Sequence, residues 1–162
     1  MRGVRHEGLR AGYVVCNNEQ PIERCGSGGI LGGIGGAGRG GGLVNGEGAT
    51  GTLSDATVVL NRVTGGAGGL GGNGGDGQGG GVFNAGPSAL GTPSFTLLRS
   101  AVVFNRAHAG AAGDGGSAGL GQGGGLYLAP GGVACADLLT DIVANDASTS
   151  DDDVFGELGD DS

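Results

Sequence analysis

The sequence predicts an all-β solenoid, a fold in which short strands stack in successive coils around a shared core. Glycine provides 44 of the 162 residues and aromatic residues only 4%, so a conventional core built on large rings is excluded. Short apolar segments recur at a nearly constant interval, and Gly-rich segments recur between them. Repeats that are each too small to bury their own apolar face can bury it by stacking on one another.

The first repeated element is a short apolar segment that ends in Asn. The four copies read VVCN, VVLN, VVFN and IVAN and end at Asn17, Asn61, Asn105 and Asn145, which gives intervals of 44, 44 and 40 residues. β-Branched residues dominate these segments, and no window shows the 3.6-residue apolar period of a helix. We therefore expect strands here and almost no helix elsewhere.

Alternation along these strands predicts which side chains face the core. Residues two apart in a strand lie on one face, which pairs Val58 with Leu60 and Val102 with Phe104. We expect both pairs to point inward. Cys16 occupies the position equivalent to Leu60, which makes it a small core residue in this alignment.

A second repeated element alternates with the first. GGGLVN ends at Asn45, GGGVFN at Asn84 and GGGLYL at Leu128. The residues that follow the three GGG[LV] motifs are Val44, Phe83 and Tyr127, and they should stack on adjacent coils. If Leu43, Val82 and Leu126 point inward, this strip points outward and is a candidate binding strip. The alternative is that the phase is reversed and Phe83 belongs to the core.

The third repeated element is a glycine insert at residues 26–42, 65–81 and 109–125, here called inserts one, two and three. The inserts contain 32 of the 44 glycines. Residues 65–76 read GGAGGLGGNGGD, a triplet period that suits an extended polyglycine II-like chain, in which neighbouring backbones approach closely. Equal phase in the repeat places all three inserts at one corner of the solenoid. The sequence leaves two alternatives, disordered loops or segments packed backbone to backbone, and we expect partial order.

These motifs resemble those of a known fold family. With GGG[LV] at 40–43, 79–82 and 123–126, and V/I-x-x-N-x-[VA] at 58–63, 102–107 and 142–147, the sequence resembles right-handed parallel β-helix repeat proteins of the pectin-lyase-like superfamily. It is most similar to Gly-rich surface repeats of the polymorphic outer-membrane and planctomycete types, which pair a GGA[IL]-like motif with F-x-x-N. Here Val or Ile replaces Phe, and the glycine inserts lengthen each interval.

The resemblance implies a right-handed parallel β-helix of about three to four coils with the inserts at one corner. Asn17, Asn61, Asn105 and Asn145 would then form a structural ladder at another corner, each amide hydrogen-bonded to the amide one rung away. The expected organisation is an N-terminal extension at 1–8, β-helix repeats at 9–147 and an acidic C-terminal tail at 148–162.

Charge and cysteine content limit the partners and metal sites that we expect for this chain. The chain has sixteen acidic residues and eight basic ones, all Arg. The resulting net charge of −8 disfavours nucleic acid as a partner. Nine of the acids lie between Asp137 and Asp161, a solvated acidic end that keeps the body soluble and discourages end-to-end stacking. Calcium binding is the alternative, because GGNGGDGQG at 71–79 resembles a calcium nonapeptide repeat. Cys16, Cys25 and Cys135 lack the spacing of a zinc site, and a Cys16–Cys25 bridge and free thiols both remain open.

The resemblance and these exclusions together predict a non-catalytic structural or adhesion module of the cell surface or extracellular space. Equivalent positions supply no column of carboxylates, since Asp55 aligns with Arg99, and a phosphate-binding loop would need Lys. No cofactor and no membrane span are expected; glycans or proteins are the expected partners. The first residues lack the apolar run of a secretory signal, so for an exported protein we expect either a signal upstream of this start or a non-standard route. We expect a fragment of a longer repeat protein with flanking repeats. The alternative function is a carbohydrate-active β-helix, a polysaccharide lyase or hydrolase.

Overall fold

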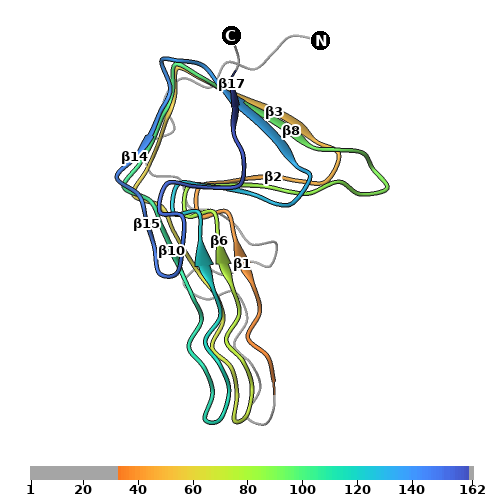
Figure 1. The fold of residues 1–162 in the computed structure, drawn as a ribbon, viewed down its shortest axis with the longest axis vertical. Coiled ribbons are helices and arrows are strands. Elements are labelled where there is room, and N and C mark those ends of the chain that lie inside the picture. Colours follow the sequence, from red (N-terminus) through yellow and green to blue (C-terminus); the bar gives the residue numbers. More distant parts are fainter. Residues whose placement is uncertain (1–32, 161–162) are drawn as a thin grey trace.

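The computed structural model describes residues 33–160, and this part of the chain is all-β, with seventeen short strands and no helix. The strands form five parallel sheets in which neighbours come from successive repeats. The chain visits the five sheets in turn, so each repeat makes one circuit, or rung, of a stack (Figure 1). Parallel strands stacked in this way form a solenoid and are compatible with a β-helix, as the sequence predicted.

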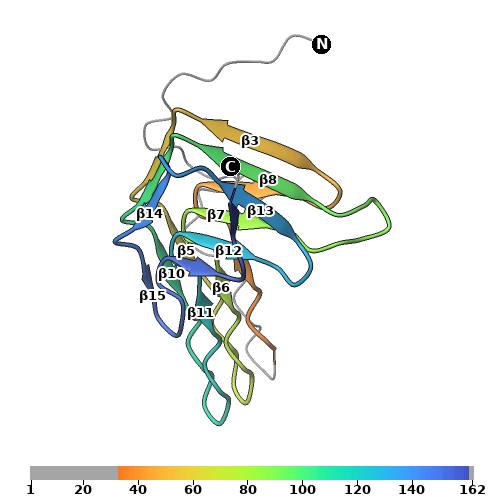
Figure 2. The same cartoon turned by 45° about the horizontal axis from the view of Figure 1, so that its top comes forward.

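Three sheets enclose the body of the solenoid, and two lie toward the glycine inserts (Figure 2). The body sheets contain β2 (Leu43–Asn45), β7 (Val82–Asn84), β12 (Leu126–Leu128) and β16 (Val154–Phe155); β3 (Thr50–Ser54), β8 (Ser94–Leu98), β13 (Val133–Ala136) and β17 (Gly159–Asp160); and β4 (Thr57–Val59), β9 (Ala101–Val103) and β14 (Asp141–Val143). The other two contain β5 (Arg62–Thr64), β10 (Arg106–His108) and β15 (Asp146–Ala147); and β1 (Gly38–Arg39), β6 (Gly77–Gln78) and β11 (Gly121–Gln122).

The register of the sheets follows the sequence repeat. Val82 pairs with both Leu43 and Leu126, and Val102 pairs with both Val58 and Ile142. In the last copy Ala136, not Asp137, pairs with Leu97, because that copy has one more residue between this position and its ladder asparagine. The core is a set of inward apolar residues from consecutive rungs, with these members fully or almost fully buried: Val82, Phe95, Leu97, Val102, Leu126, Leu128 and Ala134.

The prediction that Leu60 and Phe104 point inward is wrong. Each strand ends one residue earlier, at Val59 and Val103, and the next residue has a positive φ of 60° at Leu60 and 57° at Phe104. The left-handed conformation turns the chain and aims the side chain out of the solenoid. Leu60 is 77% exposed and Phe104 58% exposed. The alignment that made Cys16 a core residue therefore fails at this column, although Cys16 itself lies outside the described residues.

The glycine inserts are ordered in the described residues and form a projecting array (Figure 1). In insert two every third amide, at residues 65, 68, 71, 74 and 77, donates to a carbonyl of the next repeat, over 2.7–2.9 Å. The accepting residues are 108, at the end of β10, and 111, 114, 117 and 120 in insert three. Gly35 and Gly38 of insert one donate to carbonyls of insert two in the same way. A hydrogen bond at every third residue between extended chains is the polyglycine II-like pattern, so the packed alternative holds rather than disordered loops.

Backbone contact in the array explains the glycine triplets. A Cβ placed on Gly74 would overlap the Gly110 carbonyl oxygen of insert three, and a Cβ on Gly72 would overlap the Gly33 carbonyl oxygen of insert one. Insert two is packed on both sides, so two of every three of its residues are Gly. Of its remaining triplet positions, Ala67, Leu70 and Asn73 are exposed and Asp76 is half-buried.

The GGG motif joins the array to the body. Its first glycine has a positive φ, for example 68° at Gly79. A Cβ on the second, Gly80, would overlap the Gly124 carbonyl oxygen of the next rung, and a Cβ on the third, Gly81, would lie 3.0 Å from the Asn105 side-chain nitrogen. The motif therefore allows a turn, a close contact between rungs and room for an asparagine side chain.

The interpretation of 148–162 as a tail needs correction, because the fold continues to residue 160. Val154 and Phe155 pair with Leu126 and Tyr127, and Gly159 pairs with Cys135. The segment is acidic by composition, yet Val154 and Phe155 repeat the apolar pair that follows GGG in earlier copies. The extension at 1–8, Asn17 and Cys25 lie outside the described residues.

We expect Gly74→Ala to open the array locally, because the new methyl group needs space that the Gly110 carbonyl occupies. Amide hydrogen exchange measured by NMR should lose protection at the hydrogen-bonded amides of residues 68, 71, 74 and 77 and of residues 110, 113, 116 and 119. Gly46→Ala is the matched control, since a Cβ there meets nothing within 4 Å. Unchanged protection in Gly74→Ala would contradict the packing of the array.

Candidate functional site

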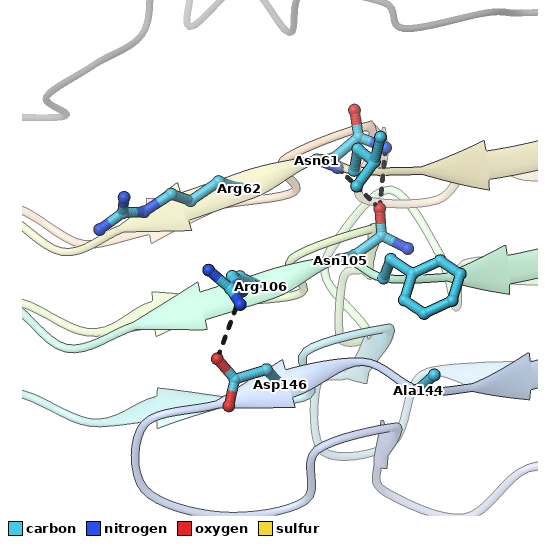
Figure 3. Close-up of a pocket in the computed structure, with 8 residues that line it drawn as sticks. Asn61, Arg62, Asn105, Arg106, Ala144 and Asp146 are labelled. Carbon is cyan, nitrogen blue, oxygen red and sulfur yellow. Dashed lines mark hydrogen bonds and ion pairs between the residues drawn. The ribbon is translucent and has the colours of Figure 1, made fainter.

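An open groove of about 420 Å³ lies at the corner between the β4–β9–β14 and β5–β10–β15 sheets (Figure 3). Three consecutive rungs contribute to it, because each rung turns this corner at the same place in the repeat. The residues that line the groove are Leu60, Asn61, Arg62, Phe104, Asn105, Arg106, Ala144 and Asp146.

Asparagines form the floor of the groove. Asn105 accepts hydrogen bonds at its Oδ1 from the backbone amide and the Nδ2 of Asn61, at 3.0 and 2.9 Å. Asn145 accepts the equivalent pair from Asn105 at 2.9 and 3.0 Å. Asn105 is fully buried, and its Nδ2 also donates to the carbonyls of Val58 and Val103. The structure thus brings together three of the four residues of the expected ladder.

One wall of the groove is apolar. Leu60, Phe104 and Ala144 occupy the same corner on successive rungs, and all have φ between 57° and 60°. Non-glycine residues rarely adopt this left-handed conformation, and for bulky side chains it costs about 1–3 kcal/mol each. The strain is sustained by the hydrogen-bonded Asn that follows each of them. The result is a column that holds an exposed leucine and an exposed phenylalanine in fixed positions.

The opposite wall is charged. Arg62, Arg106 and Asp146 follow the three ladder asparagines and pair rung to rung in the β5–β10–β15 sheet. Arg106 Nε lies 3.5 Å from Asp146 Oδ2, with both side chains more than half exposed. Arg62 has no acidic partner within 4.0 Å among the described residues. The sequence analysis did not single out this wall, although the charged residue after each Asn was a visible signal.

The two aromatic residues of the expected binding strip are covered by other parts of the chain. Leu43, Val82 and Leu126 do point toward the core, so Phe83 and Tyr127 project from the other face of their sheet. Both residues are nevertheless buried, since each is only 7% exposed. They stack in parallel with centroids 5.4 Å apart, and Phe155 continues the stack at 4.6 Å.

The base of the array covers this aromatic stack. The Arg39 guanidinium lies over the Phe83 ring at 5.5 Å, and Gln78 Nε2 donates to the Tyr127 hydroxyl at 3.1 Å. Burial, with a smaller effect from Asp76, raises the pKa of Tyr127. Of the expected strip only Val44 is open to solvent, at 49%. Phe83 and Tyr127 therefore form a second small core between the body and the array.

A second pair of asparagines was missed as a structural feature. Asn45 Nδ2 donates to Asn84 Oδ1 at 2.7 Å, and Asn84 Nδ2 donates to the Val133 carbonyl at 3.0 Å. Both asparagines are buried. The signal was present in the sequence, since GGGLVN and GGGVFN both end in Asn.

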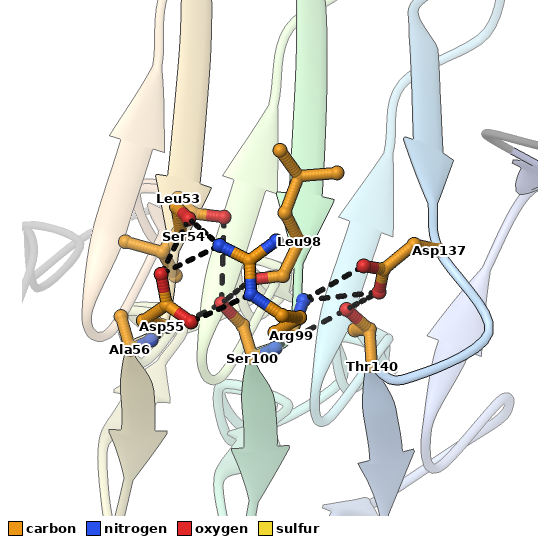
Figure 4. A network of polar contacts seen from close by, with 9 residues as sticks. All are labelled: Leu53, Ser54, Asp55, Ala56, Leu98, Arg99, Ser100, Asp137 and Thr140. Carbon is orange, nitrogen blue, oxygen red and sulfur yellow. Dashed lines mark hydrogen bonds and ion pairs between the residues drawn. The ribbon is translucent and has the colours of Figure 1, made fainter.

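A polar network occupies another corner of the body (Figure 4). Arg99 donates to both carboxylate oxygens of Asp55 at 2.7 Å, and the Arg99 backbone amide donates to Asp137. The Arg99 hydrogen bond, followed by that of Ser54, holds the pKa of Asp55 at about 2, below its ordinary value of 3.8. Hydrogen bonds from the Arg99 amide and the Thr140 hydroxyl lower the pKa of Asp137.

The calcium hypothesis focused on residues 71–79. There Asn73 Oδ1 accepts from the Ser117 amide at 2.9 Å, and Asp76 Oδ1 accepts from the Leu120 amide at 2.8 Å. These two oxygens bind the neighbouring insert. Within residues 33–160 no three His, Cys, Asp or Glu side chains converge as metal ligands would. No helix in that range is long and apolar enough to cross a membrane.

Comparison with known proteins returned no matching family model, no matching curated protein and no matching solved structure. The groove is therefore interpreted from its own chemistry. It offers Arg62 and Arg106, which stand on neighbouring strands about 4.8 Å apart, beside an apolar ridge and above an amide floor. This combination suits a partner that carries a carboxylate next to an apolar surface.

Asn105→Ala should lower the free energy of unfolding by about 1–3 kcal/mol, because it leaves buried hydrogen-bond partners on two rungs unsatisfied. Asn73→Ala is the control, since Asn73 is exposed and loses a single hydrogen bond, from the Ser117 amide, in place of a buried network. Urea denaturation of both variants measures the difference. Equal midpoints would contradict a stabilising ladder.

Phe83→Ser should destabilise the chain by about 3–5 kcal/mol, the range observed when a buried phenylalanine is truncated. Phe104→Ser is the matched control, because the same side chain is 58% exposed there and a surface change costs about 0.5 kcal/mol or less. Thermal denaturation distinguishes them. A stable Phe83→Ser protein would return Phe83 to the role of a binding residue.

The Asp55–Arg99 ion pair should stabilise the fold only above strongly acidic pH. Because folding lowers the pKa of Asp55 to about 2, its contribution is complete above 3.8 and is lost as the pH falls toward 2. Asp55→Asn should thus lower the melting temperature at pH 6 and leave it nearly unchanged at pH 2. Asn suits the positive φ of 52° at this position. The pair is exposed, so the effect is small and should shrink further in high salt. A difference that persisted at pH 2 would exclude the ion pair as its cause.

Proposed function

We propose that this chain is a non-catalytic structural and adhesion module that binds its partner through the corner groove. The observation that carries the proposal is the groove itself, in which strained, exposed Leu60 and Phe104 face Arg62 and Arg106. Strained residues and fixed apolar side chains open to solvent are typical of interaction sites.

The acidic residues support a structural role. Asp55 binds Arg99, Asp137 binds the backbone amide of Arg99, and Asp153 binds Asn145. Carboxylates that attack or protonate a substrate need an oxygen free to reach it. These acids instead use their oxygens to hold rungs together.

The proposal also specifies the type of β-helix and the location of the protein. The fold is a right-handed parallel β-helix of about three to four coils, related to pectin-lyase-like surface repeats. The module acts outside the cell or at its surface. The alternating GGG[LV] and V/I-x-x-N motifs support both points, through their similarity to polymorphic outer-membrane and planctomycete repeats.

Binding to a panel of immobilised neutral and acidic polysaccharides tests the proposal, with release of reducing ends measured in parallel. We expect retention on carboxylate-bearing polymers that weakens with added salt, and no new reducing ends. Turnover would support the alternative of a carbohydrate-active β-helix. Absence of binding to all polymers and to acidic protein surfaces would refute the adhesion role.

Variants locate the binding surface. Phe104→Ser and Arg62→Gln should each weaken retention without changing the melting temperature, because both side chains are exposed. Leu138→Ser is the control, since Leu138 is 95% exposed but lies in another loop. Equal loss with Leu138→Ser would show that binding is not located in the groove.

A further inference from the structure

Four side chains at the C-terminal end of the stack share one feature: they occupy positions that a further rung would use. They belong to Ser148, Thr149, Asp152 and Asp153. Between β15 and β16 the chain has six residues, 148–153, where earlier repeats have a glycine insert. This short segment crosses the end of the asparagine ladder and the base of the array. It belongs to neither the groove nor its walls.

Asp153 ends the ladder. Its Oδ1 accepts from the Asn145 backbone amide at 3.0 Å and from Asn145 Nδ2 at 2.9 Å. Asn145 accepts the same pair of bonds from Asn105. Asp153 therefore supplies the acceptor that the next asparagine would supply. Unlike asparagine, an ionised carboxylate has no N–H with which to donate to a further rung.

The sequence register explains how Asp153 reaches this place. Asp153 precedes Val154 just as Gly125 precedes Leu126, and Val154 pairs with Leu126. At Gly125 a Cβ would lie 2.7 Å from the Asn145 side-chain nitrogen. The rung that contains Asp153 has no asparagine at the ladder corner. The space that such an asparagine would fill is therefore open to the Asp153 side chain.

The array ends in a similar way. In insert three the amides equivalent to the donors of insert two belong to residues 109, 112, 115, 118 and 121. The first and the last of these amides, at 109 and 121, donate to Ser148 Oγ and Thr149 Oγ1, at 2.9 and 3.0 Å. Ala118 stands where insert two has Gly74, whose Cβ would overlap a carbonyl of the next insert. The Ala118 methyl group therefore obstructs a further glycine insert.

We infer that this end of the solenoid is a built terminus that prevents a second copy of the chain from adding a rung there. Open strand edges and unpaired amide rows are templates for association, and inward carboxylates and added side chains are means of blocking them. Asp152 completes the block by accepting from the Ala147 amide at 2.9 Å.

The test is a variant that reopens the end, Ala118→Gly/Asp152→Asn/Asp153→Asn. Asn keeps the acceptor oxygens of both aspartates, removes their charges and offers new donors. Sedimentation equilibrium over a concentration series should show self-association of this variant, while the unmodified chain keeps its monomer mass. Circular dichroism establishes that the variant retains its strands.

The matched control is Ala111→Gly/Asp114→Asn/Glu157→Gln, which makes the same changes of charge and glycine content at exposed positions whose side chains make none of the contacts described above. It should remain monomeric. Equal association of the control would attribute the effect to net charge and overturn the inference. A monomeric end variant with intact strands would overturn it as well.

A measurement on the unmodified chain gives an independent answer. The amides of 112, 115 and 118 have no partner among the described residues, whereas those of 68, 71 and 74 donate to insert three. Hydrogen exchange should be at least about tenfold faster in the first set, as expected for unprotected amides. Equal protection of the two sets would show that the outer row is already covered and would overturn the inference.

Discussion

Hydrogen bonding between rungs is the constraint on which the rest of this structure depends. All five sheets are parallel, so every rung must lie within hydrogen-bonding distance of the next at every corner. Where two backbones are in direct contact there is no room for a Cβ. This explains why glycine is needed at Gly80, which packs against Gly124, and at Gly74, which packs against Gly110. Where the chain turns, a buried amide side chain must replace the missing backbone partner. The unusual composition is a direct consequence of these two needs.

Body and array meet this constraint by different means. The body buries apolar side chains such as Val82 and Leu126 and adds the asparagine ladder at one corner. The array buries almost no side chain and relies on backbone hydrogen bonds. Ordering each glycine costs about 0.5–1 kcal/mol more than ordering alanine, so an isolated array would be unfavourable. Its attachment to regularly spaced rungs brings the inserts into register, and the Phe83–Tyr127 stack fixes its base.

Sequence reasoning identified the features that repeat and missed those that depend on packing between repeats. The Asn intervals and the phase of the inserts predicted the strands, the stacking and the position of the array. Alternation failed at Leu60 because a left-handed turn interrupts the strand, and a period-two pattern contains no information about φ. The Phe83 strip pointed out of the body as expected, but the array that covers it lies at a neighbouring corner. The acidic composition of 148–160 concealed the apolar pair that continues a sheet.

The groove and the ladder are two sides of one corner, and this affects how function can be assigned. The same left-handed turn that exposes Phe104 places Asn105 in the interior, where its amide binds the rungs on either side. A change in the floor therefore alters stability as well as the shape of the groove. The walls are different, because Phe104 and Arg62 are exposed and take part in no hydrogen bond between rungs through their side chains. The wall residues can therefore vary without loss of the fold, and under the proposed function the ridge and the guanidinium groups, rather than the asparagines, would select the partner.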